Sequence, residues 1–189
     1  ADIQEWTGLP RGYQRSDARI FVDEIVVKGW SEGSALTWAV REAGADGSSA
    51  TLVGMLSVTL SGPEGNRTGE VGYWLTGAAR GRGTMTRAVA SLIDTVFDPD
   101  GPLNLSALRW RCDIHDSGRG LVPNWASWKV AWSLGFQREG RVRRFLLNDG
   151  ALHDGWIATL LPDDPREPQA PWDGPVAVSY THLTLPTKR

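Results

Sequence analysis

The chain has 189 residues, of which 41% are hydrophobic and 22% are charged, and its formal net charge is −2. This length suits a single domain with one core, and a near-neutral charge without a basic run argues against a nucleic-acid-binding protein. No apolar stretch approaches the roughly 20 residues that span a bilayer, and no signal peptide is visible, so we expect a cytoplasmic protein. The single Cys112 excludes an internal disulfide, and three scattered histidines show no ligand spacing, so we expect no metal site.

The first predicted element is a helix over residues 16–27, with Ser16 as its N-cap. Apolar and polar residues then alternate in three segments, and this period of two predicts strands. The strands cover residues 35–42, 51–60 and 70–75, with turns at 44–49 and 61–66 between them. Because these links are short, the three strands are predicted to form an antiparallel meander.

The second half of the chain begins with its clearest helical periodicity. Apolar residues recur at helical spacing from Gly83 to Phe97 and predict an amphipathic helix. Further patterns predict a strand at 108–115, a helix at 124–134 ended by Gly135, and a hairpin of strands at 137–147 and 152–161. Together these elements predict an α+β fold with a mixed, mostly antiparallel sheet flanked by helices. The strands on either side of the 83–97 helix should run parallel.

The two ends of the chain carry separate expectations. We expect one domain over residues 1–166 and a disordered tail over 167–189. Residues 178–189 continue no earlier pattern and resemble a translated sequencing adapter, so we expect them to be non-native. The chain starts at Ala1 without a methionine, which suggests that its natural beginning is missing.

An anion site is predicted where the third strand meets the amphipathic helix. The segment Arg80-Gly81-Arg82-Gly83 opens directly into that helix, whose first N–H groups have no intrahelical partner. The glycines permit close backbone approach and the arginines supply positive charge, so a diphosphate would fit. The segment lacks the Lys-Ser/Thr of a P-loop, and Thr86 stands where the third glycine of a dinucleotide fingerprint belongs.

Two stretches then carry a resemblance to a known family. Gly72-Tyr-Trp-Leu75 followed by Ala79-Arg-Gly-Arg-Gly83 resembles the acetyl-CoA-binding segment of the GNAT N-acetyltransferases, although Met85 stands where glycine or alanine is usual. Asn124-Trp-Ala-Ser127, leading to Leu134-Gly-Phe136, is similar to the RimJ/RimL-type members. The resemblance covers about residues 1–161 and implies a GNAT fold that lacks its first strand and helix.

The resemblance implies a set of acetyl-CoA-binding residues. The backbone around the 80–86 loop would bind the pyrophosphate, the end of the 70–75 strand would pair with the pantetheine arm, and Asn124 would hydrogen-bond that arm. The set comprises Tyr73, Trp74, Leu75, Arg80, Gly81, Arg82, Gly83, Thr84, Met85 and Asn124. Structural readings stay open, with Asn124 as a helix N-cap and Ser127 as a small packing residue.

The catalytic candidates are fewer. By resemblance, Ser127 would give a proton to the departing CoA thiolate. Glu70, Asp113 and His115 lie on or beside the strands that should flank the thioester, and Glu70 and His115 are our candidates for the general base. A water chain is an equal alternative. Cys112 is disfavoured as a nucleophile because its alternation places it on an apolar face.

The function implied is transfer of an acetyl group from acetyl-CoA to a primary amine, with a protein N-terminal amine as the favoured acceptor. Two alternatives stay open: a non-catalytic acyl-CoA-binding sensor of the same fold, and an acetyltransferase of a small amine such as an aminoglycoside. We expect an amine acceptor as the only partner, with no nucleic acid and no membrane, and a monomer or homodimer.

Overall fold

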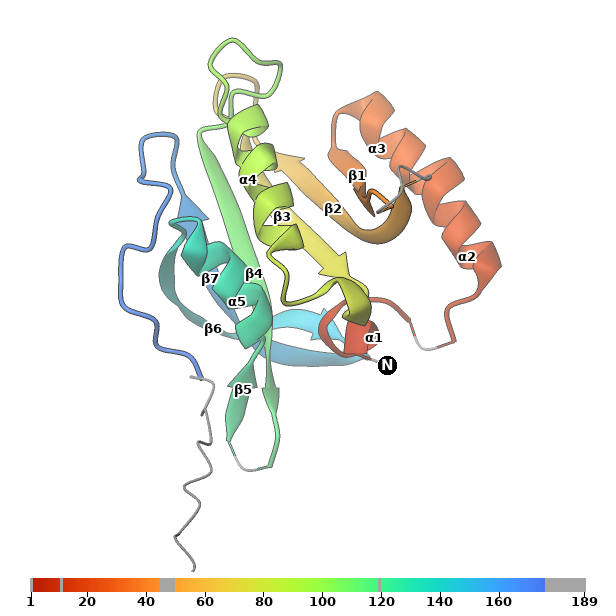
Figure 1. Ribbon diagram of the computed structural model, residues 1–189, viewed down its shortest axis with the longest axis vertical. Coiled ribbons are helices and arrows are strands. Elements are labelled where there is room, and N and C mark those ends of the chain that lie inside the picture. Colours follow the sequence, from red (N-terminus) through yellow and green to blue (C-terminus); the bar gives the residue numbers. More distant parts are fainter. Residues whose placement is uncertain (1, 11, 45–49, 119, 176–189) are drawn as a thin grey trace, which may run out of the picture.

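The computed structural model describes residues 2–10, 12–44, 50–118 and 120–175 (Figure 1). Its centre is a seven-stranded sheet in the order β1-β2-β3-β4-β7-β6, with the short β5 paired to β4. The strands are β1 (Ala35–Glu42), β2 (Thr51–Ser61), β3 (Thr68–Leu75), β4 (Ala107–Asp116), β5 (Leu121–Pro123), β6 (Gln137–Asn148) and β7 (Ala151–Leu160). The predicted α+β fold with a mixed, mostly antiparallel sheet is confirmed.

The strand pairing follows the predicted topology. Strands β1, β2 and β3 form the antiparallel meander, and β3 pairs with β4 in parallel. The β6–β7 hairpin closes through Asp149 and Gly150, which both have positive φ, as a tight two-residue turn requires. Most of the turn predicted at 44–49 lies outside the described residues.

Two helices cover one face of the sheet and build the core. They are α4 (Thr84–Val96), preceded by the 3₁₀ turn η2 (Gly77–Ala79), and α5 (Trp125–Ser133). The apolar stripe of α4 is buried, with Val89, Ile93 and Val96 almost fully enclosed. Trp110 of β4 is buried between the sheet and α5, where its ring lies 5.3 Å from that of Trp128. The period-3.6 pattern therefore identified the core-facing side of α4 correctly.

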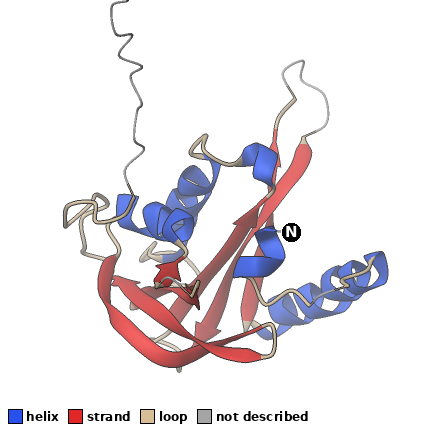
Figure 2. Ribbon diagram, turned by 90° about the horizontal axis from the view of Figure 1, so that it is seen from below, coloured by secondary structure: helices blue, strands red, loops and turns tan. Residues whose placement is uncertain are grey.

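The other side of the sheet carries the N-terminal helices (Figure 2). A continuous helical segment consists of α2 (Arg15–Ile20), the π-helical η1 (Phe21–Val26) and α3 (Val27–Glu32), and it contacts β1. The prediction of Ser16 as N-cap is wrong, because Asp17 accepts a hydrogen bond from the backbone of Gln14 and the helix begins at Arg15. The helix also continues past residue 27, to Gly33 in the left-handed conformation.

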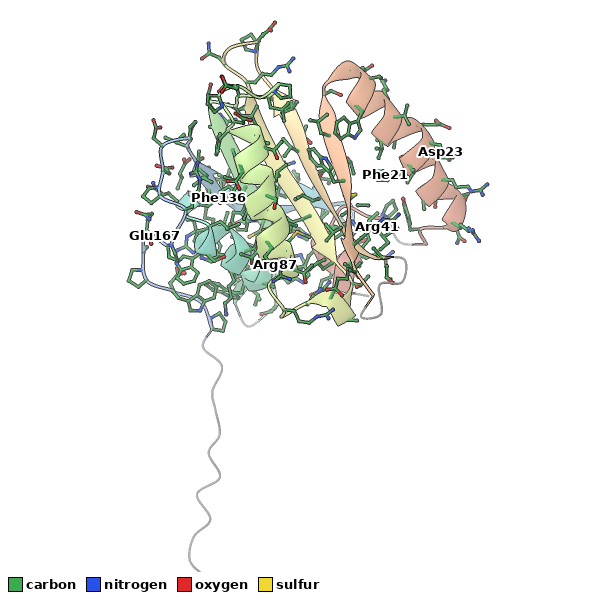
Figure 3. The ribbon with its side chains drawn as sticks, turned by 45° about the horizontal axis from the view of Figure 1, so that its top comes forward. Phe21, Asp23, Arg41, Arg87, Phe136 and Glu167 are labelled. Carbon is green, nitrogen blue, oxygen red and sulfur yellow. The ribbon has the colours of Figure 1, made fainter. Side chains whose placement is uncertain are left out.

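Residues 162–175 form a segment that packs along α5, although a disordered tail was predicted from residue 167. The Trp172 ring lies between those of Trp125 and Trp132, at 5.9 and 5.2 Å, and the Trp132 indole N–H donates to the Ala170 carbonyl. Figure 3 shows Glu167 on this segment, near Phe136 beyond the end of α5. The prediction failed because these contacts join residues about 40 apart, which no local pattern reveals.

Candidate functional site

The first feature of the site is a divergence of β3 from β4. The parallel pairing runs only from Thr68 with Ala107 to Val71 with Trp110, while both strands continue beyond it. Past this point β4 pairs with β5, and the Asp113 carbonyl accepts the N–H of Asn124. Among the described residues, no strand pairs with the 72–75 end of β3 on this side. That end therefore offers strand-type hydrogen bonds to an extended ligand.

The N-terminus of α4 opens next to the end of β3. Gly83 is the N-cap in the left-handed conformation, and no side chain caps this terminus in the part of the chain that is described. Any other residue at position 83 would place its Cβ 3.1 Å from an Nη of Arg87 and would crowd that guanidinium. Met85 is only 5% exposed and packs in the core. Its thioether therefore does not fill the loop, and the first-turn N–H groups suit an anion such as a diphosphate.

The two arginines of this loop are bound to the protein itself. Arg80 donates to the Leu75 carbonyl through Nε at 3.1 Å and through an Nη at 2.9 Å. Arg82 pairs with Glu42, the last residue of β1, at 2.8 Å, and Thr84 donates to the same carboxylate at 3.1 Å. The sequence placed Arg80 and Arg82 as charge for a ligand, whereas both side chains have protein acceptors. Glu42 went unnoticed because it lies 40 residues before Arg82.

Ser127 belongs to a small polar cluster between α5 and the sheet. Its hydroxyl lies 3.2 Å from the Tyr73 hydroxyl and accepts the Trp110 indole N–H at 3.0 Å. Tyr73 also accepts from Trp110 at 3.0 Å and donates to the Ser127 carbonyl at 3.0 Å. Burial raises the pKa of Tyr73 above its ordinary value, so its hydroxyl stays neutral. Since β3 and β4 separate just after Trp110, a hydroxyl donor stands at the point of divergence.

Asn124 is a helix N-cap, the structural role that the sequence left open for it. Its side-chain oxygen accepts the N–H of Ser127 at 3.0 Å, so it is the N-cap of α5. The cap fixes the first turn of the helix and with it the position of the Ser127 backbone. Hydrogen bonding of Asn124 to a pantetheine arm stays a prediction.

The surroundings of Glu70 and Cys112 limit the chemistry that each side chain can carry out. Glu70 forms an ion pair with Arg111 at 2.7 Å, which commits its carboxylate to a cation. Cys112 is buried, and desolvation raises the pKa of its thiol to about 12. A thiol with this pKa is almost wholly protonated at neutral pH, which agrees with its low rank as a nucleophile.

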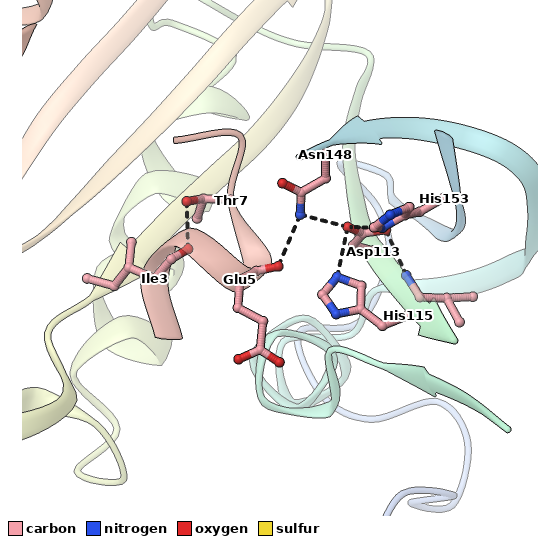
Figure 4. A network of polar contacts seen from close by, with 8 residues as sticks. Ile3, Glu5, Thr7, Asp113, His115, Asn148 and His153 are labelled. Atoms are coloured by element: carbon pink, nitrogen blue, oxygen red, sulfur yellow. Dashed lines mark hydrogen bonds and ion pairs between the residues drawn. The ribbon is translucent and has the colours of Figure 1, made fainter. Parts of the chain in front are cut away.

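A second polar cluster lies on the opposite face of β4 (Figure 4). The carboxylate of Asp113, only 5% exposed as a residue, accepts hydrogen bonds from Asn148 at 2.9 Å and from the backbone of Ile114 at 3.0 Å. His115 Nε2 and His153 Nδ1 lie 3.1 and 3.0 Å from the same carboxylate. The Trp6 ring stacks on His115 at 4.1 Å, and Asn148 also donates to the Glu5 carbonyl of α1 (Asp2–Trp6).

This cluster corrects the reading of the histidines as scattered. One potential ligand atom from each of Asp113, His115 and His153 lies within 4.8 Å of the others, so the three could hold a metal ion. His153 and Asn148 were missed because they come from β6 and β7 rather than β4. The hairpin at 148–150 was the available signal, since it brings those two strands beside β4.

A cavity of about 760 Å³ opens over this second cluster. It is lined by His115 and His153, by the polar Gln4 and Asn148, by the apolar side chains of Leu9, Ile114, Leu121 and Leu152, and by the acidic residues Glu5, Asp116, Asp149 and Asp154. The described lining contains no lysine or arginine. Asp154 is paired with Arg141, and the Arg144 backbone N–H followed by that guanidinium lowers the pKa of its carboxyl. The cavity is therefore suited to a cationic ligand.

The fold and the divergent strands define an acyltransferase-like α+β domain, and comparison with known proteins identifies its family. Residues 1–137 match the acetyltransferase (GNAT) domain. The chain therefore belongs to the GNAT acetyltransferase family, as the sequence resemblance indicated. No helix in the described residues is long and apolar enough to cross a membrane.

Individual relatives of this chain have low sequence identity to it. A probable N-acetyltransferase, YjcK, from Bacillus subtilis (strain 168) is 30% identical over 100 residues, covering 52% of this chain and 49% of the relative. The chain thus matches about half the length of this curated relative. The ribosomal-protein-S5-alanine acetyltransferase from Vibrio fischeri superposes with a TM-score of 0.66 at 23% identity, covering 86% of this chain and 81% of that protein. Mycobacterium smegmatis RimJ, in complex with CoA-disulfide, gives 0.65 at 20% identity over 85% and 70%.

Proposed function

We propose that this chain is an acetyl-CoA-dependent N-acetyltransferase that acetylates a primary amine, with a protein N-terminal amine as the acceptor. The observation that carries the proposal is the 72–75 end of β3, which no described strand pairs on the side of β4, beside the N-terminus of α4, which no described side chain caps. Together these offer one extended edge and one anion site, which match the pantetheine arm and the pyrophosphate of one ligand. Family membership supports the same chemistry.

Separate groups of residues would bind acetyl-CoA and assist the transfer. Backbone N–H groups from Gly81 to Thr86 would bind the pyrophosphate, and the backbone of Tyr73, Trp74 and Leu75 would bind the pantetheine arm. Bound acetyl-CoA would supply an activated acetyl thioester for attack by the neutral amine. A β3 N–H would polarise the thioester carbonyl. Ser127 would protonate the leaving sulfur, since its hydroxyl is held by Trp110 and Tyr73 at the strand divergence.

The acceptor assignment rests on the relatives and on the cavity over the Asp113 cluster. Ribosomal-protein acetyltransferases are among the solved structures that share the fold. The cavity over His115 and His153 is apolar in part and acidic in part, which suits a free amine attached to an uncharged chain. An aminoglycoside or another small amine would present the same ammonium group, so the acceptor must be tested directly.

The test is an assay of CoA thiol release with acetyl-CoA and a panel of amines. The panel contains peptides with free and with blocked N-termini, a polyamine and an aminoglycoside. We expect release with the free peptides and none with the blocked ones. Acetyl-CoA binding without thiol release for any amine would contradict the enzyme assignment and favour a ligand-binding module.

The role of Ser127 is tested by Ser127→Ala. We expect kcat to fall about 100-fold, in line with the loss of a general acid, while the Kd for acetyl-CoA changes by less than about twofold. Ser133→Ala is the matched control, because the Ser133 hydroxyl donates to the Val130 carbonyl of the same helix and contacts no other polar partner among the described residues. Equal activities of the two variants would remove Ser127 from the mechanism.

A further inference from the structure

We propose that Asp113, His115 and His153 form a binding site for one divalent transition-metal ion, with Zn²⁺ as the probe. Two imidazole nitrogens and one carboxylate oxygen are ligands of the kind that hold Zn²⁺ in proteins. The three side chains lie on the α1 side of the sheet, opposite the Ser127 cluster. The metal site is therefore independent of the proposed N-acetyltransferase function.

The sheet itself brings the three side chains together. Asp113 and His115 are two residues apart on β4, so both side chains point to the same face. Ile114 of β4 pairs with Asp154 of β7. The next residues along these two antiparallel strands are His115 and His153, and their rings lie 5.1 Å apart. Two neighbouring strands therefore supply all three ligands, and regular backbone pairing sets their separation.

The distances between the ligand atoms are close to those within a coordination shell. His115 Nε2 and His153 Nδ1 lie 3.1 and 3.0 Å from the same oxygen of Asp113, Oδ2 (Figure 4). Ligand atoms at about 2.0–2.2 Å from a tetrahedral Zn²⁺ are about 3.3 Å apart. One ligand atom from each residue lies within 4.8 Å of the others. Both imidazoles are partly exposed, which leaves room for the small adjustment that would close the shell around an ion.

The Asp113 carboxylate is a buried charge with no lysine or arginine partner among the described residues. Its side chain is only 4% exposed, and its ion-pair partners are the two histidines. Its Oδ2 faces nitrogens of His115, His153 and Asn148, although one oxygen has two lone pairs. Buried charges in proteins are paired or coordinate metals. A divalent ion between the imidazoles and Oδ2 would compensate this carboxylate and relieve the crowding at one oxygen.

Contacts around the cluster hold the ligands in place. The backbone N–H of Ile114 donates to Asp113 Oδ1 at 3.0 Å, and Asn148 donates to Oδ2 at 2.9 Å. Hydrogen bonds of this kind orient the ligating carboxylates of metal sites. The Trp6 ring stacks on His115 at 4.1 Å and sets the plane of that imidazole. The ion would therefore tie β4 and β7 together beside α1, which carries Trp6.

The cavity over the cluster supplies access and an attractive charge. His115 and His153 belong to its wall, whereas Asp113 is buried and is not part of the lining. An ion held by all three would have its remaining coordination position on the cavity side, where water or a small ligand can bind. Glu5 and Asp116 are among the acidic residues of the same lining, so a cation is attracted to the cavity.

The test is isothermal titration calorimetry of Zn²⁺ into the full chain, without an affinity tag and after removal of metals with a chelator. We expect one Zn²⁺ per chain with a Kd below about 10 µM, and binding of Mg²⁺ and Ca²⁺ about 100-fold weaker or more, because those ions prefer oxygen ligands. A Kd for Zn²⁺ above this value would overturn the proposal. Ca²⁺ binding as tight as that of Zn²⁺ would do so too, since it would assign the ion to the acidic lining.

Three variants identify the ligands. His115→Gln and His153→Gln each remove one imidazole and should weaken Zn²⁺ binding about tenfold or more, since even the loss of an outer-shell partner costs 10- to 100-fold. Asp116→Asn is the control, because it removes a charge from the same lining and leaves the three ligands in place. It should change the Kd by less than about threefold. Wild-type binding by either histidine variant, or an equal loss in Asp116→Asn, would contradict the site.

A spectroscopic readout on the wild-type chain covers the case in which a variant does not fold. With ¹¹³Cd²⁺ in place of Zn²⁺ and ¹⁵N-labelled histidine, we expect couplings of the metal to Nε2 of His115 and Nδ1 of His153. Coupling to one histidine or to none would overturn the site. These titrations contain neither acetyl-CoA nor an amine. A chain that binds Zn²⁺ and acetylates no amine therefore removes only the proposed function, and an active chain that binds no Zn²⁺ removes only the metal site.

Discussion

Glu42 places a carboxylate at the mouth of the proposed pyrophosphate site. It pairs with Arg82 at 2.8 Å and accepts a hydrogen bond from Thr84, the first residue of α4, at 3.1 Å. A bound pyrophosphate would compete with this carboxylate for the same donors and would be repelled by its charge. The ion pair is partly exposed, so its contribution is screened to about 1 kcal/mol or less.

We therefore expect Glu42→Gln to bind acetyl-CoA about three- to tenfold more tightly than wild type, because the repulsion disappears and Arg82 is freed. Isothermal titration calorimetry at two salt concentrations measures this, and the gain should shrink as salt rises. Glu64→Gln, on the exposed 61–66 turn, is the charge-matched control. Unchanged or weaker binding by Glu42→Gln would show that Glu42 supports the loop instead.

At the residue scale, the sequence located the loop but not the partners of its side chains. Gly81 and Gly83 have the positive φ values that a bend before α4 requires. The acceptors of Arg80 and Arg82 could not be predicted, because a guanidinium finds its partner in three dimensions and Glu42 arrives from the edge strand β1.

At the element scale, α5 depends on the segment that packs along it. Trp172 contacts the rings of Trp125 and Trp132, and Asp173 pairs with Arg138, whose guanidinium lies 4.2 Å from the Trp156 ring centre. Because α5 carries Ser127 and is capped by Asn124, this segment stabilises the helix that holds Ser127, the proposed general acid, in position.

Trp172→Ala should lower the free energy of unfolding by about 2 kcal/mol, since a partly buried indole is lost from this aromatic cluster. Urea unfolding followed by Trp fluorescence and circular dichroism measures the change. Gln169→Ala is the control within the same segment, because that side chain donates to the nearby Glu167 carbonyl, two residues away. A change below about 0.5 kcal/mol in Trp172→Ala would mean that the segment does not stabilise α5.

The Arg138–Asp173 pair makes part of this support pH-dependent. Burial alone would raise the pKa of Asp173, but the hydrogen bond and the charge of Arg138 outweigh it and lower the pKa. The stabilisation is therefore complete above the unfolded value, about 3.9, and is lost as pH falls through the lower folded value. We expect Asp173→Asn to be less stable than wild type at pH 7, with a difference that narrows below pH 4. A difference that grows on acidification would contradict this pairing.

Elements with a strong period of apolar residues could be predicted from the sequence. Elements that exist only because strands pair in the folded sheet could not. The strands and α4 follow their apolar patterns, whereas β5 has three residues and exists because it pairs with the free edge of β4. The long helix was underestimated at both ends, because Asp17 caps its start and Gly33 ends it.

At the scale of the whole molecule, the sheet separates two polar clusters. Ser127, Tyr73 and Trp110 gather on the side of α5, and the Asp113 cluster gathers on the side of α1. The meander and the parallel β3–β4 pair were predictable from order and link length. The Asp113 cluster was not, because its members come from β4, β6 and β7 and meet only when the sheet is complete.

The central claim is that one ligand binds both the β4-facing side of β3 at residues 72–75 and the N-terminus of α4. A ¹⁵N–¹H NMR titration of the chain with acetyl-CoA tests it most directly. The account predicts saturable shifts of the backbone amides of Tyr73 to Leu75 and Gly81 to Thr86, with a common Kd. Saturable binding that leaves both groups of amides unmoved, or no binding at all, would contradict it.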